Sequence, residues 1–320
     1  MNSRYDIIII GAGPAGLSCA IEAQKAAMKY LVVDKGGVVN SIQQFARDMP
    51  FFSTPELLEV GGIPFVIPST RPTSLDCVNY YRSVAEHYRL HCRFFEPVVG
   101  VEKRNGGFAL KTAHGTELET RAVVIATGYY DTPSLLGVPG EQLPRVSHYY
   151  RDALPYFQQD VLVVGGKNSA VEAALDLWRH GARVTVVHRG QALSSGVKYW
   201  ILPDFQNRVT DGSITVHFGC TVGEFLPGRT IVQESTGNTL DVRTDFAFVL
   251  IGYRPNVDFM KSIGIEVNED SLAPVHNAET METNVPNVFV AGGLVGGRFN
   301  NKIFIENGRE HGKRIVASLK

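Results

Sequence analysis

Residues Tyr5–Gly16 read Y-D-I-I-I-I-G-A-G-P-A-G and join an apolar run to a glycine-rich turn. Ile7–Ile10 is an uninterrupted isoleucine run with no polar alternation, which is typical of a parallel strand buried on both faces. We expect Gly11 to turn the chain, Gly13 to let the backbone approach a pyrophosphate, and Gly16 to allow close packing of the next helix. The stretch predicts the phosphate-binding turn of a dinucleotide-binding fold.

The surroundings of this turn favour a nucleotide ligand. Pro14 suits the first helical turn, where a missing N–H costs little, and the free N–H groups and dipole at a helix start attract phosphate. A second apolar strand, Tyr30–Val33, ends in Asp34, close to the separation at which an acidic residue binds the adenosine ribose. The alternative is that Asp34 only caps or solvates the strand end. The combination of strand, glycine turn, helix and acid favours the ribose.

Composition limits the class of protein. A chain of 320 residues exceeds the usual size of one domain, so we expect two domains. Lys plus Arg number 31 against 32 for Asp plus Glu, which gives no indication of nucleic acid or a membrane surface. Cys19, Cys77, Cys92 and Cys220 lack the spacing of a disulfide framework or a metal site. The early apolar run is too short for a signal peptide and no stretch reaches transmembrane length, so we expect a cytoplasmic protein.

Further elements follow Asp34. A glycine-led loop at 35–41, which begins with Lys35 and contains Asn40, leads away from the ribose end of the nucleotide. We then expect a helix at 75–90, a strand at 94–101, a hairpin of 108–112 with 117–122, and a buried strand at 123–128. That strand ends in Ala126-Thr127-Gly128, small residues that let a ligand approach the backbone. The long irregular connection at 51–65 is of a kind usually retained for function, with plain packing as the alternative.

The same plan repeats from Val161. Val161–Val164 is a second buried strand, followed by Gly165-Gly166-Lys167-Asn168-Ser169-Ala170 and a helix that stops at Gly181. The next strand, 183–187, ends in His188-Arg189, where the first copy has Asp34-Lys35. Arginine binds a ribose 2′-phosphate through parallel charge-assisted hydrogen bonds, whereas an acid repels it. This predicts NADPH rather than NADH, with mostly neutral His188 as a weaker contributor. The alternative for Arg189 is an ordinary solvated surface side chain.

The rest of the chain closes both units. Short strands at 213–218, 221–226 and 229–233 lead into an apolar run at 246–251 and Gly252. Proline and polar residues interrupt the pattern at 129–133 and 254–256, which we interpret as domain boundaries. A strand at 287–291 then returns to the first nucleotide with Gly292-Gly293 at its end. A C-terminal helix at 303–319, interrupted by glycines, starts where it can face the same ligand.

These residues together resemble the two-nucleotide flavoproteins of the thioredoxin-reductase type and, within them, the bacillithiol-disulfide reductases. The resemblance covers essentially the whole chain. Its carriers are Gly11–Gly16, Val39-Asn40-Ser41, Phe51-Phe52-Ser53-Thr54, Ala126-Thr127-Gly128, Val164–Glu172 and Ile303-Phe304-Ile305-Glu306-Asn307-Gly308. Lys167, which replaces a glycine of the second motif, is similar to the bacillithiol branch rather than to thioredoxin reductase itself.

The resemblance implies an α/β fold of two Rossmann-like, three-layer ββα domains, with an NADPH domain (131–254) inserted in a discontinuous FAD domain (1–130 and 255–320). It also implies association into a homodimer. The residues expected to bind FAD are Gly11, Gly13, Pro14, Ala15, Gly16, Asp34, Lys35, Asn40, Ala126, Thr127, Gly128, Gly292, Gly293, Lys302 and Ile303. Those expected to bind NADPH are Gly165, Gly166, Lys167, Asn168, Ser169, Ala170, His188, Arg189 and Gly252.

Three departures from the family pattern concern redox chemistry. Thioredoxin reductases carry a Cys-x-x-Cys just before the second fingerprint strand, where this chain has Val146-Ser147-His148-Tyr149-Tyr150. Several bacillithiol-type relatives have a cysteine at the position of Ala15. Gly293 stands where thioredoxin reductases place an acid near the ribityl chain of the flavin. We therefore predict that no cysteine of this chain is required for reductase activity.

The expected chemistry is hydride transfer from NADPH to FAD, with the protein supplying position and electrostatics. The start of the helix near Ile303, assisted by Lys302, is expected to stabilise the reduced flavin. For Lys302 the alternative is a solvated lysine. His148 is a candidate proton donor to a leaving thiolate, although a lone histidine is more often structural.

The electron acceptor stays open at this point. One candidate is a small-molecule disulfide of the bacillithiol type or another low-molecular-weight disulfide. A second is a redox carrier protein that takes one electron, such as ferredoxin or flavodoxin. A third possibility, from a different class, is a nucleotide-sensing binding protein without turnover.

Overall fold

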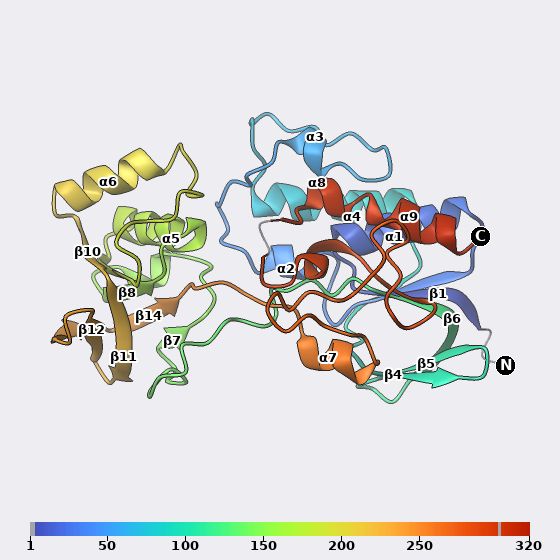
Figure 1. The fold of residues 1–320 in the computed structure, drawn as a ribbon. Coiled ribbons are helices and arrows are strands. Elements are labelled where there is room, and N and C mark those ends of the chain that lie inside the picture. Colours follow the sequence, from blue (N-terminus) through green and yellow to red (C-terminus); the bar gives the residue numbers. More distant parts are fainter. Residues whose placement is uncertain (1–3, 300–301) are drawn as a thin grey trace. The chain divides into compact units, whose positions relative to one another are not determined.

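The chain forms two compact units (Figure 1), and the computed structural model describes residues 4–299 and 302–320. Unit 1 contains the described residues of Met1–Gln43, Pro50–Thr132 and Tyr253–Lys320. Unit 2 contains Gln44–Met49 and Pro133–Gly252. The expected first domain spanned 1–130, whereas Gln44–Met49 groups with unit 2, because the Arg47 N–H donates to the Arg151 carbonyl there (3.2 Å).

Unit 1 is built on a seven-stranded sheet of order β3-β2-β1-β6-β5-β4, with β15 also paired to β6. The strands are β1 (Tyr5–Ile10), β2 (Tyr30–Val33), β3 (Cys92–Arg93), β4 (Val98–Arg104), β5 (Gly107–Thr112), β6 (Glu117–Ile125) and β15 (Val288–Val290). In the parallel centre, Ile10 pairs with Val33 and with Ile125. Ile125 also pairs with Val290. The carboxyl ends of β2, β1, β6 and β15 therefore meet at one edge of the sheet, where parallel α/β folds bind ligands.

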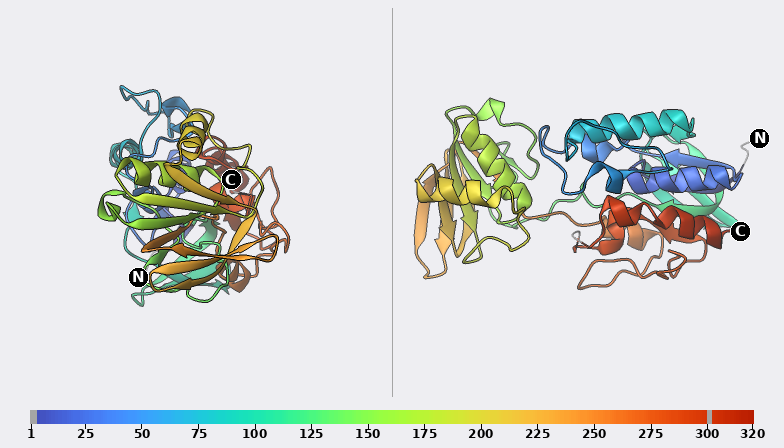
Figure 2. Two further views of the ribbon diagram at one scale, coloured as in Figure 1. Left: turned by 90° about the vertical axis from the view of Figure 1, so that its left-hand side faces the viewer. Right: turned by 90° about the horizontal axis from the view of Figure 1, so that it is seen from above.

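Helices α1 (Pro14–Lys25), α4 (Ser74–His87) and α9 (His311–Ser318) cover one face of this sheet, whereas α7 (Val257–Ser262) lies beside β4 (Figure 1). The other elements are α2 (Asn40–Gln43), α3 (Pro55–Leu58), η2 (Gly292–Gly296) and α8 (Ile305–Gly308). Figures 1 and 2 show α4, α1 and α9 side by side in one layer. Within the described residues, no helix is both long enough and apolar enough to cross a membrane.

Three expected elements of unit 1 differ from the structure. The strand expected at 94–101 is replaced by β3 and β4, because Phe95 adopts a left-handed conformation (φ 56°) between them. We expected a hairpin arm at 117–122 and a separate buried strand at 123–128, but one strand, β6, spans both. Its side chains alternate between exposed and buried up to Arg121, and all of them are buried from Ala122 to Ile125. The helix expected at 303–319 is divided into α8 and α9, because the Arg309 carbonyl accepts the Ser18 hydroxyl (2.5 Å) and Glu310 bonds three residues back to Asn307.

Unit 2 has three layers. A parallel sheet of order β10-β9-β8-β14-β7 lies between helices and a separate antiparallel sheet of order β11-β12-β13. The elements are β7 (Val146–Ser147), η1 (Leu154–Tyr156), β8 (Asp160–Val164), α5 (Asn168–Arg179), β9 (Arg183–His188), α6 (Leu202–Thr210), β10 (Ile214–Phe218), β11 (Cys220–Leu226), β12 (Arg229–Glu234), β13 (Thr239–Arg243) and β14 (Phe246–Val249). One apolar core lies between the parallel sheet and α5 with α6, and a second lies between the two sheets. Both units are thus Rossmann-like.

Candidate functional site

The first glycine turn, between β1 and α1, packs so closely on neighbouring backbone that Gly11 and Gly16 have no space for a side chain. A Cβ at Gly11 (φ 114°) would lie 2.4 Å from the Ala126 carbonyl oxygen, and one at Gly16 would lie 1.9 Å from the Gly11 oxygen. Gly13 differs: its φ of −73° suits any residue, and a Cβ there would meet no atom within 4 Å. The open space beside Gly13 at the N-terminus of α1 fits a pyrophosphate.

Asp34 lies at the same edge of the sheet. Its carboxylate accepts hydrogen bonds from the N–H groups of Ala12 (2.6 Å) and Gly36 (2.8 Å). Burial raises the pKa of Asp34, and these two hydrogen bonds oppose that rise. Each carboxylate oxygen keeps a free lone pair, so the group can still accept from ribose hydroxyls. Neighbouring Lys35 forms an exposed ion pair with Asp131 (2.9 Å).

Asn40 lies close to this carboxylate. It begins α2, and its side chain occupies the space above Gly36, where a Cβ would lie 2.2 Å from Asn40 Oδ1. The preceding residue, Val39, is buried in a left-handed conformation (φ 47°) that is rare for a β-branched residue. Its N–H donates to the Ala12 carbonyl (3.0 Å), which fixes this loop on the glycine turn.

The ends of β6 and β15 complete this edge. Ala126, Thr127 and Gly128 (φ 68°) follow the end of β6. After β15, a Cβ at Gly292 (φ 75°) would lie 2.8 Å from the Ala15 Cβ. The structure therefore brings most of the expected FAD residues together around one turn.

His311 is a residue at this edge that the sequence analysis missed. Its Nδ1 accepts the Gly292 N–H (3.1 Å), and only 5 % of the residue is exposed. Burial, with smaller contributions from Arg314 and His276, lowers the pKa of His311 to about 4. The imidazole is therefore neutral and holds the Gly292 backbone through its free nitrogen. No local spacing signals this contact, because its partner lies on another element.

The C-terminal segment is bound to the irregular connection at 51–65. Ser53 Oγ donates to Glu306 Oε2 (2.6 Å), which joins two family motifs that lie 253 residues apart. Ile303 packs against Gly308, where a Cβ would lie 3.5 Å from Ile303 Cγ2. Lys302 is exposed, and its Nζ lies 4.9 Å from the centre of the Phe299 ring.

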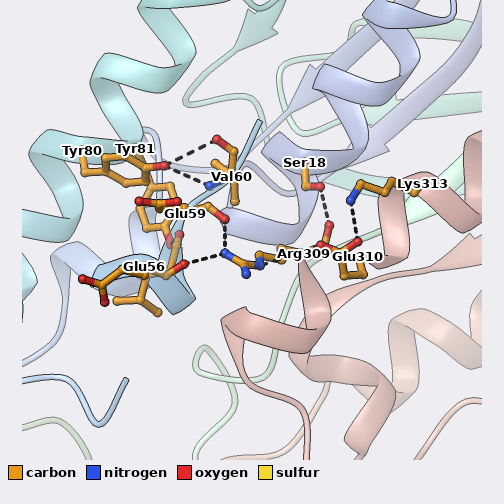
Figure 3. A network of polar contacts seen from close by, with 10 residues as sticks. Ser18, Glu56, Glu59, Val60, Tyr80, Tyr81, Arg309, Glu310 and Lys313 are labelled. Carbon is orange, nitrogen blue, oxygen red and sulfur yellow. Dashed lines mark hydrogen bonds and ion pairs between the residues drawn. The ribbon is translucent and has the colours of Figure 1, made fainter. Parts of the chain in front are cut away.

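Figure 3 shows a polar network that anchors the same connection. Arg309 Nη1 donates to the carbonyl oxygens of Glu56 (3.1 Å) and Glu59 (2.5 Å). On α4, the Tyr80 hydroxyl accepts the Val60 N–H (2.9 Å), and the Tyr81 hydroxyl donates to the Leu58 carbonyl (2.8 Å). The connection is thus ordered by buried hydrogen bonds, consistent with a segment that holds a fixed surface near a ligand.

The second glycine turn, between β8 and α5 in unit 2, has the same place between strand and helix as the first, although the two motifs share only their first glycine. A Cβ at Gly165 (φ 145°) would lie 2.6 Å from the Leu250 carbonyl oxygen and 2.9 Å from the Ala170 Cβ. Lys167 takes the N-cap position that Gly13 has in unit 1. Its side chain is exposed and forms no hydrogen bond or ion pair with the residues that the structure describes, and the same holds for the side chain of Ser169. A helix N-terminus with an available ammonium group fits a phosphate.

His188 and Arg189 at the end of β9 have different roles. The His188 ring packs on Gly166, where a Cβ would lie 2.4 Å from His188 Cε1. Burial is the largest influence and lowers the pKa of His188. Arg189 is exposed, and its guanidinium contacts no acid among the described residues. Arg189 is therefore the group available to a 2′-phosphate, while His188 supports the turn.

Asn168 orders the loop that follows Arg189. Its Oδ1 accepts the Lys198 N–H (2.7 Å), and its Nδ2 donates to the Gly196 carbonyl (3.1 Å). The Lys198 side chain is buried and forms an ion pair with Glu172 on α5. These contacts fix the loop beside the second glycine turn.

Gly252 (φ 104°), which was also expected near NADPH, has no atom within 4 Å of the place where a Cβ would lie.

His148 belongs to unit 2 and has a structural partner. Its Nε2 lies 2.9 Å from Glu141 Oε1, and the same buried carboxylate accepts the N–H groups of Leu136 (2.8 Å) and Gly137 (2.7 Å). Burial alone would raise the pKa of Glu141. The hydrogen bonds from His148, Leu136 and Gly137 outweigh this effect and hold the pKa below its usual value. The pair fixes the start of unit 2.

The cysteines are poor redox groups. All four are free thiols, and Cys19, Cys77 and Cys220 are buried. Burial raises the pKa of Cys19, Cys77 and Cys92 to about 12, and it also raises that of Cys220. Because the thiolate is the reactive form, these raised pKa values favour the less reactive protonated thiols at neutral pH.

Comparison with known proteins agrees with this geometry. The pyridine nucleotide-disulphide oxidoreductase family matches residues 8–292. The chain is 43% identical to bacilliredoxin reductase Bdr of Bacillus subtilis (strain 168) over 98% of this chain and 96% of that protein. It is 40% identical to the structure of bacillithiol disulfide reductase Bdr (YpdA) from Bacillus cereus, with a TM-score of 0.96 over 99% of each chain. Thioredoxin reductase from T. acidophilum, at 21% identity, has a TM-score of 0.77 over 99% of this chain and 97% of that one, and shares the fold.

These relatives are reductases, and FAD and NADPH are the cofactors of the family. The open space at Gly13 and the unpaired cations at Lys167 and Arg189 fit these two groups. The chain belongs to the pyridine nucleotide-disulphide oxidoreductases and, within them, to the family of the Bdr reductases, thioredoxin-reductase-like flavoproteins.

Proposed function

We propose that this chain is an NADPH-dependent FAD oxidoreductase that reduces a low-molecular-weight disulfide of the bacillithiol type. One observation carries the proposal. Each unit has a strand, a glycine turn, a helix and a second strand in the same order. The second strand is followed by an acid, Asp34, in unit 1 and by a base, Arg189, in unit 2. The acid suits the ribose of FAD, and the arginine suits the 2′-phosphate of NADPH.

Unit 1 holds FAD in this proposal. The turn from Gly11 to Gly16 receives the pyrophosphate, and Asp34 receives the adenosine ribose. The residues after β6 and β15 border the remainder of the dinucleotide. Lys302 and the short α8 keep only a minor role in stabilising the reduced flavin, because a four-residue helix has a weak dipole.

Unit 2 holds NADPH. Lys167 and the N-terminus of α5 bind the pyrophosphate, and Arg189 binds the 2′-phosphate. Gly165 and Gly166 allow the close approach, while Asn168 holds the loop at 190–198 beside it. This arrangement gives a preference for NADPH over NADH.

FAD held by unit 1 would supply hydride and electron transfer, so that two electrons from NADPH, with two protons, would convert the disulfide to two thiols. The chain positions both cofactors and supplies no thiol, because its described cysteines are protonated at neutral pH. The acceptor disulfide therefore meets the flavin directly. His148 is bonded to Glu141, which favours its structural alternative.

The names of two relatives bear on the acceptor. One is called a bacillithiol disulfide reductase, which supports the small disulfide, and the other is called a bacilliredoxin reductase, which names a redox carrier as its acceptor. Association of two subunits, expected from the resemblance, is part of the proposal.

A one-electron carrier protein is the second candidate acceptor. The protonated thiols favour it, since a flavin can deliver electrons singly without a cysteine. A relative called ferredoxin–NADP reductase from Ignicoccus hospitalis is 24% identical over 90% of this chain.

A stopped-flow acceptor comparison tests these alternatives. The protein is reduced anaerobically with one equivalent of NADPH and mixed with bacillithiol disulfide, glutathione disulfide, an oxidised bacilliredoxin, ferredoxin or flavodoxin. We expect bacillithiol disulfide to reoxidise the flavin fastest. Fastest reoxidation by ferredoxin or flavodoxin would replace the proposal with the second candidate. A flavin that NADPH does not bleach would indicate a nucleotide-sensing protein without turnover.

A further inference from the structure

Unit 2 contains a cavity of about 290 Å³ beside the apolar core that lies between its two sheets. Its walls are formed by β7 with the residues before it, by the hairpin between β11 and β12, and by the start of β14, all labelled in Figure 1. The second glycine turn lies at the other end of β14, where the Leu250 carbonyl meets Gly165. The cavity is therefore separate from the site that we assign to NADPH.

Backbone hydrogen bonds fix the walls of this cavity. The Thr244 N–H donates to the Gly228 carbonyl in the hairpin (3.0 Å), and the Ala247 N–H donates to the Arg145 carbonyl (2.9 Å). Most of the lining is apolar and includes the side chains of Leu143, Val146, Phe225, Leu226 and Phe246. A preformed apolar cavity of this volume lies at the lower end of the range for ligand pockets and fits a molecule of about ten non-hydrogen atoms.

One wall carries a buried hydroxyl without a partner. Thr230, on β12, is 0 % exposed, and its Oγ1 has no hydrogen-bond partner among the described residues. The other threonine of the lining, Thr244, donates its hydroxyl to the Val242 carbonyl (2.9 Å). Because an unpaired buried hydroxyl is costly, the Thr230 side chain indicates a place for a hydrogen-bonding group of a ligand.

A cation without an acid borders the same cavity. Arg145 is exposed, and its guanidinium carbon lies 5.7 Å from the centre of the Phe246 ring. It forms no ion pair in the part of the chain that the structure describes. The acid in the lining, Asp245, accepts the Asp160 N–H instead (2.9 Å) and interacts electrostatically with Arg183. The positive charge of Arg145 is thus available to an anionic ligand.

We propose that this cavity binds a small carboxylic acid with an apolar body. Arg145 binds the carboxylate, the apolar side chains enclose the body, and the Thr230 hydroxyl bonds a second polar group. Charge complementarity selects an acid over an amine, and the unpaired hydroxyl selects a body that carries a hydroxyl or carbonyl oxygen. The site is independent of both dinucleotides, and the inference does not rest on the proposed function.

Binding of para-hydroxyphenylacetate to the FAD-loaded, full-length protein tests the proposal. A ligand-observed NMR titration should show saturable binding with a dissociation constant on the order of 1 mM. Phenylacetate, which lacks the hydroxyl, should bind roughly two- to tenfold more weakly. Tyramine, which carries an ammonium group in place of the carboxylate, should bind at least about tenfold more weakly. Saturating NADPH should leave binding of the acid unchanged, because the two sites lie at opposite ends of β14.

Two variants separate the polar groups. Arg145→Gln removes the charge, so the dissociation constant of para-hydroxyphenylacetate should rise about fivefold or more. Arg229→Gln is the matched control, because Arg229 is an exposed arginine of the same hairpin that pairs with Asp241 (2.8 Å) and does not line the cavity. Thr230→Val keeps the shape of the side chain and should abolish the preference for para-hydroxyphenylacetate over phenylacetate. Its melting temperature should be unchanged or higher, since an unpaired hydroxyl is removed.

Four results would each overturn the inference: no saturable binding to the wild type, equal binding of tyramine, displacement of the acid by NADPH, or unchanged affinity in Arg145→Gln. A Thr230→Val protein that kept the preference for the hydroxylated acid would contradict the assignment of that hydroxyl. None of these results depends on the electron acceptor of the flavin, so the proposed function is tested separately.

Discussion

Gly13 and Lys167 take the same position in two copies of one structural element, and they offer a ligand different things. Each is the N-cap of the helix that follows a glycine turn. Gly13 leaves open space, with no atom within 4 Å of a Cβ, whereas Lys167 places an exposed ammonium group there. In the proposed function, the first turn therefore makes room for FAD, and the second attracts NADPH by charge.

The histidines near the two turns extend this comparison. His311 accepts a hydrogen bond from Gly292 in unit 1, and His188 packs its ring on Gly166 in unit 2. Burial lowers the pKa of both. A neutral imidazole thus lies against a glycine backbone in each unit, at Gly292 after β15 in unit 1 and at Gly166 in the turn of unit 2.

Blocking the open space in the first turn should have the largest effect. Gly13→Val places a branched side chain where we expect the pyrophosphate, so several charge-assisted hydrogen bonds are lost together. We expect FAD affinity to fall at least about a thousandfold, equivalent to about 4 kcal/mol. Flavin absorbance of the purified protein measures this. Lys167→Val is the matched control and should purify with full flavin; full flavin in Gly13→Val as well would refute the assignment of the turn.

Acid should weaken unit 1 through His311. The folded pKa of about 4 lies below the ordinary 6.5, so between these values the unfolded chain binds a proton that the folded one does not. Stability therefore falls as pH drops through this window, by up to about 3 kcal/mol. Arg314 and His276 are the charged and titratable neighbours that oppose protonation.

Urea unfolding followed by flavin fluorescence at several pH values measures this loss. His311→Asn keeps an acceptor for Gly292 but does not titrate, so it should flatten the pH dependence. An unchanged slope in that variant would assign the effect to other groups. His188 shifts in the same direction, so unit 2 should weaken in acid with the same sign.

Removing the charge at the end of β9 should change cofactor choice. Arg189→Ala loses a charge-assisted contact of about 1.5–3 kcal/mol, so the KM for NADPH should rise roughly tenfold to hundredfold. NADH lacks the 2′-phosphate and should be nearly unaffected. Steady-state kinetics with both cofactors measure this, and an equal loss for the two would argue for the solvated-arginine alternative.

The charge at the second turn should have the smallest effect. Lys167→Ala removes one exposed cation near a helix N-terminus, which is worth about 0.3–1 kcal/mol. The KM values for NADPH and NADH should therefore rise together by roughly two- to fivefold. An effect confined to NADPH would instead place Lys167 beside the 2′-phosphate.

The sequence predicted the parts of both sites that depend on local pattern. The strand, turn and helix around Gly13, the acid at Asp34, and their repeat at Gly165 and Arg189 follow from spacing alone, because neighbouring residues make these contacts. The strand expected at 94–101 was right only from Val98 onward, because the left-handed backbone at Phe95 precedes β4 and no residue type announced this.

Contacts between distant segments were not predictable. Tyr129 meets Gly293, His311 meets Gly292, and Ser53 bonds to Glu306 only because the sheet aligns β6 and β15 and the C-terminal segment packs beside them. The same packing divides the C-terminal helix at Arg309, whose carbonyl turns to Ser18. Such pairings arise from tertiary structure, on which periodicity carries no information.

A variant without cysteines tests most directly the central claim, that the flavin reduces its acceptor without a thiol of this chain. Cys19, Cys77, Cys92 and Cys220 are replaced together by alanine or serine, and flavin content confirms the fold. We predict that NADPH still bleaches the flavin and that turnover of the best acceptor is retained, since burial keeps these thiols protonated. Loss of acceptor turnover with flavin reduction intact, traced to one cysteine by single replacements, would contradict the account and identify that residue as a redox thiol.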